Sequence, residues 1–157
     1  HAVAPRQHTG LLLGMVEQVL AEAGVSRRGL DLVAFGRGPG AFTGVRVAAS
    51  VAQGLALARD LPVAPVSTLA ALAAGGARLT GARRVAAALD ARRDEIYFAA
   101  LEFPSPLAAG HVVIADCVLA PEDVALADAA AWLAVGNGWS TYAARLPAAL
   151  AAMPRHD

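Results

Sequence analysis

A glycine-rich turn between an apolar run and a long apolar helix constrains this fold more than any other feature of the chain. Residues 36–46 read Gly-Arg-Gly-Pro-Gly-Ala-Phe-Thr-Gly-Val-Arg, with four glycines and one proline. Glycine is required where φ is positive or where a side chain would block a close approach. Backbone N–H groups at the start of the following helix favour an anion. The turn therefore predicts a strand–turn–helix unit that brings bare backbone close to a neighbour or a ligand.

The apolar pattern of the first half of the chain predicts alternating helices and strands. Helical periodicity and short apolar runs give a helix over 9–23, a buried strand over 30–35, a helix over 43–59 capped by Thr43, a strand over 61–66 and a short helix over 67–74 that is capped by Ser67 and closed by Gly75-Gly76. Strands that alternate with helices indicate a parallel arrangement, and hence an α/β fold.

The pattern changes after Arg84. Two apolar runs separated by a polar connection predict adjacent strands over 85–89 and 96–103, and the proline-containing stretch 104–110 follows. The remaining pattern predicts a strand over 111–119, a helix over 121–130, a strand over 132–135 and a helix over 141–153 that Pro147 interrupts. We place a domain boundary at the proline stretch, with residues 1–103 before it and 104–157 after it.

Composition excludes several classes of function. All 13 basic residues are arginine, which removes mechanisms that need a phosphate-loop or Schiff-base lysine. The formal net charge is zero, so no broad nucleic-acid footprint is expected. No apolar stretch approaches the roughly 20 residues that a membrane-spanning helix needs. Cys117 is the single cysteine, so an internal disulfide is excluded and we expect Cys117 to lie in the core.

No residue is predicted to be catalytic or to bind a metal. The histidines are scattered and form no pair at helical spacing; they are His1, His8, His111 and His156. We expect His8 to cap the first helix. Asp90 and Glu95 flank a turn that also holds Arg92 and Arg93, which favours a solvated ion-pair cluster over an acid–base pair.

The first two predicted helices carry more apolar surface than one sheet can cover. The helix over 43–59 is apolar around its whole circumference, and the first helix contains three leucines in succession at 11–13. We predict a partner interface formed by Leu11, Leu12, Met15, Val19, Val47, Val51 and Leu55. Self-association, a different partner and coverage by parts of the chain outside this sequence remain open alternatives.

The glycine turn also permits a nucleotide site. Gly36-x-Gly38-x-x-Ala41 fits a loose dinucleotide fingerprint after a strand, but the next predicted strand ends in Ser67 instead of an acidic residue. A tight structural turn is the simpler interpretation. The alternative is a nucleotide-binding enzyme whose phosphate cradle spans Gly36–Gly44, with a nucleotide-facing loop formed by Gly36, Arg37, Gly38, Gly40, Gly136 and Gly138.

Six segments in order resemble the TsaB family, also called YeaZ, whose members help to make N6-threonylcarbamoyladenosine in tRNA. The most specific segment is 35–46. The others are Gln7-His8-Thr9, Gln53-Gly54-Leu55-Ala56, Val66-Ser67-Thr68-Leu69, Asp90-Ala91-Arg92 with Glu95-Ile96-Tyr97, and Val135-Gly136-Asn137-Gly138-Trp139. The resemblance covers nearly the whole sequence, with Ala41 where serine is commoner and Ala48 where glycine is frequent.

The resemblance implies an actin-like ATPase fold of two ribonuclease-H-like lobes, here without the family's first strands and closing segment. It implies a noncatalytic subunit that pairs through its first two helices with a TsaD-like paralogue, which transfers threonylcarbamoyl to the adenosine beside the anticodon. A TsaE-like ATPase joins them, and a homodimer in isolation is an alternative. The resemblance implies a cytoplasmic protein with no cofactor of its own, and it leaves open ATP or ADP at the subunit junction.

Overall fold

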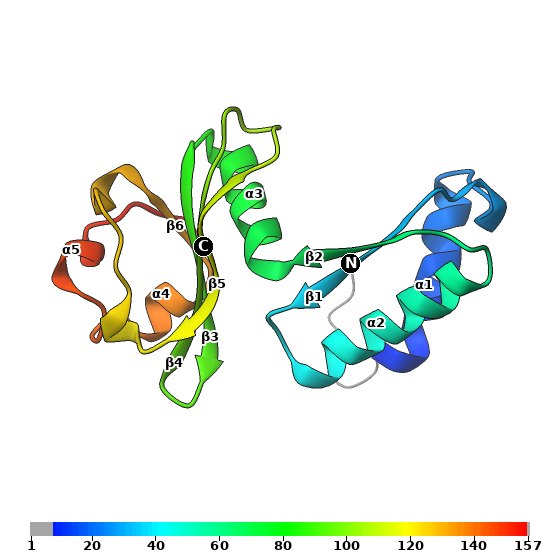
Figure 1. The fold of residues 1–157 in the computed structure, drawn as a ribbon, viewed down its shortest axis with the longest axis horizontal. Helices are drawn as coiled ribbons and strands as arrows, with labels where there is room; N and C mark the ends of the chain where they lie inside the picture. The colour runs from blue at the N-terminus through cyan, green and yellow to red at the C-terminus, as the bar shows by residue number, and fades with distance from the viewer. Residues whose placement is uncertain (1–7, 157) are drawn as a thin grey trace. The chain divides into compact units, whose positions relative to one another are not determined.

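The chain is divided into two compact units. The structure is a computed structural model that describes the backbone of residues 8–156 and the side chains of residues 11–156. Unit 1 is His1–Val66 and unit 2 is Ser67–Asp157 (Figure 1). The boundary that we placed after residue 103 differs from this division, because it separates two strands that pair within one sheet of unit 2. The assignment of family lobes to residues 1–103 and 104–157 stays a prediction.

Unit 1 consists of two long helices and two short strands. In chain order the elements are α1 (His8–Glu22), the 3-10 turn η1 (Arg27–Gly29), β1 (Val33–Gly38), α2 (Phe42–Leu57) and β2 (Val63–Ser67). The two strands pair in a two-stranded sheet, and α2 packs against β1. The two predicted helices and the two predicted strands are therefore confirmed as elements, with ends that shift by one to three residues.

Two local predictions for unit 1 are wrong. The strand leading into the glycine turn is not buried, since Val33 and Phe35 are half-buried and Ala34 is exposed. The described part of the chain supplies only one paired strand and one helix to cover β1. Thr43 does not cap α2 either. The helix begins at Phe42, so the capping position belongs to Ala41, which has no side-chain acceptor.

Unit 2 is built on a five-stranded mixed sheet. Its main elements are α3 (Thr68–Thr80), β3 (Arg84–Arg92), β4 (Glu95–Glu102), β5 (His111–Leu119), β6 (Leu133–Val135), α4 (Gly138–Thr141), α5 (Ala148–Ala151) and β7 (Arg155–His156). The strand order is β5-β4-β3-β6-β7. The first three strands in that order are antiparallel, whereas β6 is parallel to β3 and to β7. The predicted α/β class is confirmed.

Helix α3 runs through the two glycines that we expected to end it. It continues to Thr80 and ends at Gly81, which has a φ of 78° and whose N–H donates to the Ala77 carbonyl. The sequence missed this because Gly76 serves packing. A Cβ at Gly76 would lie 2.7 Å from Cγ1 of Val135 in β6. The predicted cap is confirmed, since the Ser67 hydroxyl accepts a hydrogen bond from the N–H of Ala70.

The helix predicted over 121–130 is wrong, and of the helix predicted over 141–153 only the short part after the interruption at Pro147 is present. Residues 121–130 form no α-helix, and only the short 3-10 turns η2 (Pro121–Asp123) and η3 (Ala129–Ala131) are present there. Residues 138–151 form the separate short helices α4 and α5, and Pro147 occupies the capping position of α5. Large side chains in these segments point into the core, so tertiary packing overrides helix propensity.

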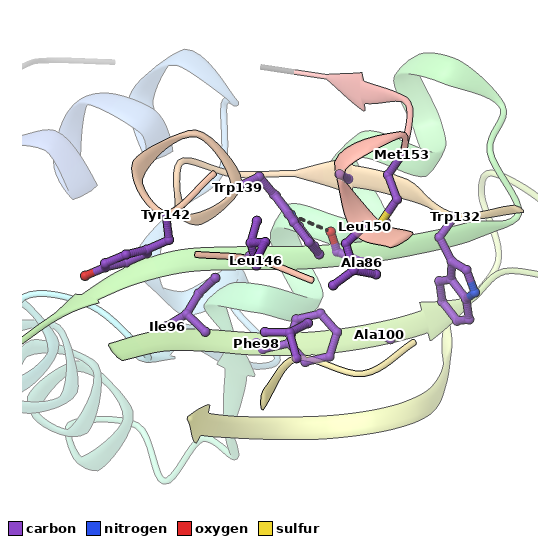
Figure 2. Packing of buried hydrophobic residues seen from close by; sticks show 13 residues of the cluster. Ala86, Ile96, Phe98, Ala100, Trp132, Trp139, Tyr142, Leu146, Leu150 and Met153 are labelled. Carbon is purple, nitrogen blue, oxygen red and sulfur yellow. Dashed lines mark hydrogen bonds between the residues drawn. The ribbon is translucent and has the colours of Figure 1, made fainter. Parts of the chain in front are cut away.

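The sheet of unit 2 has an apolar core on each face. Because side chains alternate along a strand, neighbours such as Ala86 and Ala87 contribute to opposite faces. One face packs against Leu69, Ala73 and Ala77 of α3. The other face packs against the segment around α4 and α5, through Trp139, Tyr142, Leu146, Leu150 and Met153 (Figure 2). Alanines in the strands leave room for these larger side chains.

Trp139 anchors the second of these cores. Its indole lies almost perpendicular to the ring of Phe98, at an interplanar angle of 82° and a centroid distance of 6.0 Å. The indole Nε1 donates to the carbonyl oxygen of Ala86 at 3.2 Å (Figure 2). It also donates to the carbonyl oxygen of Val135 at 3.2 Å. A buried tryptophan whose polar atom is satisfied in this way fixes the start of α4 against β3.

Candidate functional site

Helix α1 exposes a stripe of apolar side chains. Leu11, Met15 and Val19 are spaced four residues apart, so they lie on one side of the helix, and they are 43%, 37% and 61% exposed. Leu12 is half-buried. Within the described residues of unit 1 these side chains stay exposed, which makes the stripe a candidate interaction surface.

A groove of about 470 Å³ lies between α1 and α2. Its walls are apolar, formed by Leu13, Val16 and Leu20 of α1 and by Val51 and Leu55 of α2. The remaining lining residues are Arg27, Leu30, Ser50, Gly54, Ala58, Arg59 and Leu61. No other described residue of unit 1 covers the lining side chains between the two helices, so the groove is open.

A second hollow follows the outer side of α2 towards its first turn. Phe42, Thr43, Arg46, Val47, Ser50 and Val51 line it. The guanidinium carbon of Arg46 lies 3.7 Å from the centroid of the Phe42 ring, which is a close cation–π contact. Since Ser50 and Val51 line both hollows, the apolar surface continues from the groove to the start of α2.

The residues of the predicted partner interface all lie in unit 1, on the first two helices. Leu11, Met15 and Val19 form the exposed stripe of α1, Val51 and Leu55 line the groove, Val47 lines the second hollow, and Leu12 is half-buried. Leu13, Val16 and Leu20 also line the groove and were not among the predicted interface residues, although Leu13 belongs to the run of three leucines. The interface role itself stays a prediction.

The glycines of the predicted loop differ in what the fold requires of them. Gly38 is buried with a φ of 94°, a conformation that favours glycine, whereas a Cβ there would make only an ordinary contact with Val45 at 3.4 Å. Gly36 has open space at its Cβ position, and Gly40 meets only Val45 at 3.8 Å. Arg37 lies at the end of β1 and is exposed. Backbone conformation therefore explains one of these three glycines, Gly38, and no contact within the described residues requires the other two.

Gly136 and Gly138 belong to unit 2, where the fold explains them. Gly136 has a φ of 97°, and a Cβ there would lie 2.3 Å from the carbonyl oxygen of Ala88. A Cβ on Gly138 would lie 2.9 Å from the carbonyl carbon of the same residue. Both glycines let the segment after β6 lie directly against the backbone of β3. That they face a nucleotide together with the loop of unit 1 stays a prediction.

The turn between β3 and β4 is held by a polar network that the sequence did not reveal. Asp90 accepts hydrogen bonds from the hydroxyl of Tyr142 and from the N–H of Arg92, each at 2.7 Å. These bonds lower the pKa of Asp90, with the larger effect from Tyr142, and the same contact raises the pKa of Tyr142 to about 12. No ion pair joins Asp90 or Glu95 to Arg92 or Arg93 among the described residues: the hydroxyl and the backbone N–H satisfy the Asp90 carboxylate, and the charge of Arg92 has only a smaller effect on its pKa.

Arg145 forms ion pairs with two acidic side chains near this turn. It donates to both carboxylate oxygens of Glu122, from Nε at 2.6 Å and from Nη2 at 3.1 Å, and it lies 3.1 Å from Oδ1 of Asp94. The hydrogen bond from Arg145 lowers the pKa of Glu122 and raises that of the arginine. The paired groups are solvated, so this network fastens the loop after β5 to the segment before α5 and presents no desolvated acid or base.

Within the part of the chain that the structure describes, no cluster of three or more histidine, cysteine, aspartate or glutamate side chains could hold a metal ion. His111 and His156 are exposed, and His1 and the predicted capping side chain of His8 lie outside the described residues. None of the described helices has the length and apolar character that crossing a bilayer would demand.

Cys117 packs at the margin of the core of unit 2. It is half-buried, and its thiol lies 3.4 Å from the carbonyl oxygen of Phe98, to which it donates. Burial, followed by the charge of Asp116, raises the pKa of the thiol. A protonated, half-covered thiol is a packing group, so the prediction that Cys117 lies in the core is confirmed only in part: it packs against the core and is not enclosed by it.

Comparisons with known proteins identify the family. The family model described as "TsaD: tRNA N6-adenosine threonylcarbamoyltransferase" matches residues 2–147. The chain is 41% identical over 143 residues to the tRNA threonylcarbamoyladenosine biosynthesis protein TsaB of Escherichia coli, covering 89% of this chain and 62% of that protein. It is 51% identical over 96 residues to the Haemophilus influenzae protein of the same name, covering 61% of this chain and 41% of that protein.

The solved structures agree with the curated relatives. YeaZ from Pseudomonas aeruginosa superposes with a TM-score of 0.85 at 48% sequence identity, over 93% of this chain and 68% of that one. The chain thus spans less than two thirds of the length of the two curated relatives and about two thirds of the solved structure. The fold expected from the resemblance is supported by the family model and by this superposition.

Proposed function

This chain belongs to the TsaB (YeaZ) family of TsaD-related proteins, and we propose that it acts in threonylcarbamoyladenosine formation in tRNA as a docking subunit for a TsaD-like paralogue. The paralogue would carry out the transfer of threonylcarbamoyl to the adenosine beside the anticodon. A TsaE-like ATPase would join the two subunits. The curated relatives are named for this biosynthesis, which supports the process, and the surface of unit 1 supports the docking role.

The observation that carries the docking role is the apolar surface of α1 and α2. Val19 of α1 is 61% exposed, and the groove between the helices has a volume of about 470 Å³ and apolar walls. Exposed apolar area of this extent on two adjacent helices is typical of a protein–protein interface, and its burial would supply the main favourable free energy of association. The first two helices of a paralogue with the same fold would offer a similar apolar surface.

The side chains of this chain would carry out no chemical step. The polar networks around Asp90 and Arg145 consist of solvated, paired groups that fasten loops. The chain alone would bind no cofactor. ATP or ADP would bind, if at all, at its junction with the paralogue. The setting of this activity would be the cytoplasm, where tRNA is modified.

Reconstitution of the tRNA modification tests the proposal. Purified TsaD-like and TsaE-like proteins are incubated with substrate tRNA, threonine, bicarbonate, ATP and the enzyme that makes the threonylcarbamoyl adenylate, with and without this chain. We expect modified adenosine only when the chain and the paralogue are both present. Modification by this chain without the paralogue would overturn the noncatalytic assignment, and full activity of the paralogue without the chain would overturn the docking role.

A further inference from the structure

A small polar pocket lies at one end of the sheet of unit 2. It has a volume of about 280 Å³ and is lined by Arg83, Arg84, Glu102, Phe103, Pro104 and His111. The start of β3, the end of β4 and the start of β5 meet there, because Arg84, Glu102 and His111 are in register on the three neighbouring strands. The proposed docking role does not use this pocket, since α1 and α2 belong to unit 1.

The two arginines of the pocket differ in how they are held. Nε of Arg84 lies 2.8 Å from Oε1 of Glu102, and the guanidinium carbon lies 5.8 Å from the centroid of the Trp132 ring, so this side chain has a fixed direction. The side chain of Arg83 is exposed and makes no hydrogen bond or ion pair with any other residue of the range 8–156. The charge of Arg83 is therefore available to a ligand.

The base of the pocket is packed and rigid. The N–H of Phe103 donates to the carbonyl oxygen of Arg83 at 2.7 Å, and the Phe103 side chain is 3% exposed. A Cβ at Gly110 would lie 2.7 Å from the Phe103 ring, so the residue before His111 lies directly against that ring. The basic side chains thus project from the ends of paired strands, which preorganises them better than a free loop would.

This end of unit 2 is basic although the unit as a whole is not. Residues 67–157 contain seven arginines and nine acidic residues. Among the side chains that line the pocket, Glu102 is the one acid, and Arg84 neutralises it. The segment 103–115, which leads from the end of β4 into β5, contains no acidic residue at all. The pocket therefore presents a local excess of positive charge, centred on Arg83.

We propose that this pocket binds a backbone phosphate of an RNA. Arg83 and Arg84 would donate to the non-bridging oxygens, because guanidinium groups bind phosphate through paired N–H donors. A volume of about 280 Å³ lies below the roughly 300–1,000 Å³ of pockets that enclose a drug-sized ligand, which suits one phosphate with its ribose. Such a contact positions the RNA without reading bases, so it needs no broad basic footprint.

Glu102 favours RNA over an acidic segment of a protein as the ligand. An ionised carboxylate only accepts hydrogen bonds, and it has about four lone-pair sites, so its contact with Arg84 leaves some of them for a ligand. The 2′-hydroxyl of a ribose is a donor that lies close to its phosphate. An aspartate or glutamate side chain would bring no donor and would meet the charge of Glu102.

The source of the RNA rests on the proposed function, which makes tRNA the substrate of the assembled complex. The pocket adds that this chain contacts the tRNA itself, through unit 2, while unit 1 docks the paralogue. The same phosphate chemistry could hold free inorganic phosphate or ATP, so the test includes both.

The salt dependence of tRNA binding tests the inference. The Kd of labelled tRNA for the complex of this chain with its paralogue is measured by fluorescence anisotropy, over a range of salt concentrations, for the wild type, Arg83→Gln and Arg83→Glu. We expect Arg83→Gln to raise the Kd about threefold and to lower the slope of log Kd against log salt by about 1, and Arg83→Glu to raise the Kd about tenfold or more. Arg155→Gln and Arg155→Glu are matched controls that should change neither quantity, because Arg155 is exposed on β7, at the opposite edge of the sheet from β5.

An unchanged Kd and slope in the Arg83 variants, or an equal change in the Arg155 variants, would overturn the inference. Tight binding of inorganic phosphate or ATP that Arg83→Gln abolishes, with an unchanged tRNA Kd, would assign the pocket to the free ligand and overturn it as well. Loss of a protein subunit from the Arg83→Glu complex, with tRNA binding intact, would do the same in favour of an acidic protein surface.

The two proposals fail separately. If the wild-type complex assembles and modifies tRNA but the Arg83 variants bind tRNA as it does, the phosphate pocket alone is overturned. If the wild-type chain forms no complex with the paralogue, the docking role fails, and the same Kd series on the chain alone decides the pocket. Circular dichroism checks the fold of every variant, and Arg83→Gln carries the test if Arg83→Glu does not fold.

Discussion

The hydroxyl of Tyr142 donates a 2.7 Å hydrogen bond to Oδ1 of Asp90, across 52 positions of the sequence. The N–H of Asp90 donates in turn to Oδ1 of Asn137 at 3.2 Å, and the N–H of Arg92 donates to Oδ1 of Asp90. The end of β3 is thereby tied to the segment that begins with Gly136. Residues 92–94 all have positive φ, between 51° and 64°, so this tight turn depends on the bonds that Asp90 accepts.

Stability should depend on pH through this pair. The pKa of Asp90 is lowered from 3.8, so its contribution is present above pH 3.8 and is lost as the pH falls through the lower folded value. The pKa of Tyr142 is raised from 10.0 to about 12, so its contribution is present below pH 10 and is lost as the pH rises towards 12. We expect Tyr142→Phe to have a lower urea midpoint than the wild type between pH 3.8 and pH 10. Plotted against pH, the midpoints of the two proteins should converge at more acidic and more alkaline pH.

The matched control for this prediction is Tyr97→Phe, which removes the other tyrosine hydroxyl of the chain. It should leave the pH dependence of the wild type in place, because no hydrogen bond joins Tyr97 to Asp90 in the described structure. Equal loss of the alkaline dependence in both variants would contradict a specific role of the Tyr142–Asp90 bond.

Adjacent glycines in α3 should respond to alanine in opposite directions. Gly75 has nothing within 4 Å of its Cβ position, so Gly75→Ala should stabilise the chain by about 0.5–1 kcal/mol through helix propensity. At Gly76 the new Cβ would lie 2.7 Å from Val135, and overpacking should cost about 1–3 kcal/mol. Chemical denaturation of both variants measures the difference, and a destabilised Gly75→Ala would contradict this packing.

Local patterns predicted the elements that depend on short-range sequence. The helix of residues 8–22, the cap at Ser67 and the antiparallel pair β3–β4 follow from apolar periodicity and turn residues. Gly76 looked like a helix stop because its contact, Val135, lies 59 positions further along the chain. Long-range packing also explains the two helices predicted near the C-terminal end, since Val124 of 121–130 and Tyr142 and Leu146 of 141–153 lie in the core with residues of β3 and β4.

The candidate surface was predictable in kind but not in detail. Excess apolar residues in the first two helices pointed to an interface on Leu11, Met15 and Val19, which are exposed. The stacking of Arg46 on Phe42 could be found only from the coordinates. Spacing of four residues allows a cation–π contact without requiring it, because either side chain has other rotamers.

Alanine substitutions at one glycine of each unit should distinguish a structural role from a role in ligand binding. Gly136→Ala should destabilise by about 1–3 kcal/mol through its positive φ, and by more through the clash with Ala88, whereas Gly36→Ala should fold normally. Calorimetry of the chain alone with ATP and with dinucleotides should detect no tight binding and no turnover. Tight binding that Gly36→Ala abolishes would favour the nucleotide-binding enzyme over the docking subunit.

A charge on the apolar surface of unit 1 should prevent association and leave a folded chain. Val51→Asp places a carboxylate in the groove between α1 and α2, where a docked partner would bury it without a counter-ion at a cost of about 3–5 kcal/mol. Val19→Asp places a carboxylate on the exposed stripe of α1. Because Val19 is 61% exposed, the substitution should change the stability of the monomer little. Leu107→Asp, on an 83% exposed leucine of unit 2, is the control.

Light scattering with the purified paralogue measures this effect, and circular dichroism checks the fold. We expect Val51→Asp and Val19→Asp to abolish the complex at micromolar concentration and Leu107→Asp to keep it, since about 4 kcal/mol corresponds to roughly a thousandfold in Kd. If both unit 1 variants are folded and still bind, the partner lies elsewhere on the chain. The exposed leucines and valines of α1 would then need a different explanation, because unit 1 itself leaves them uncovered.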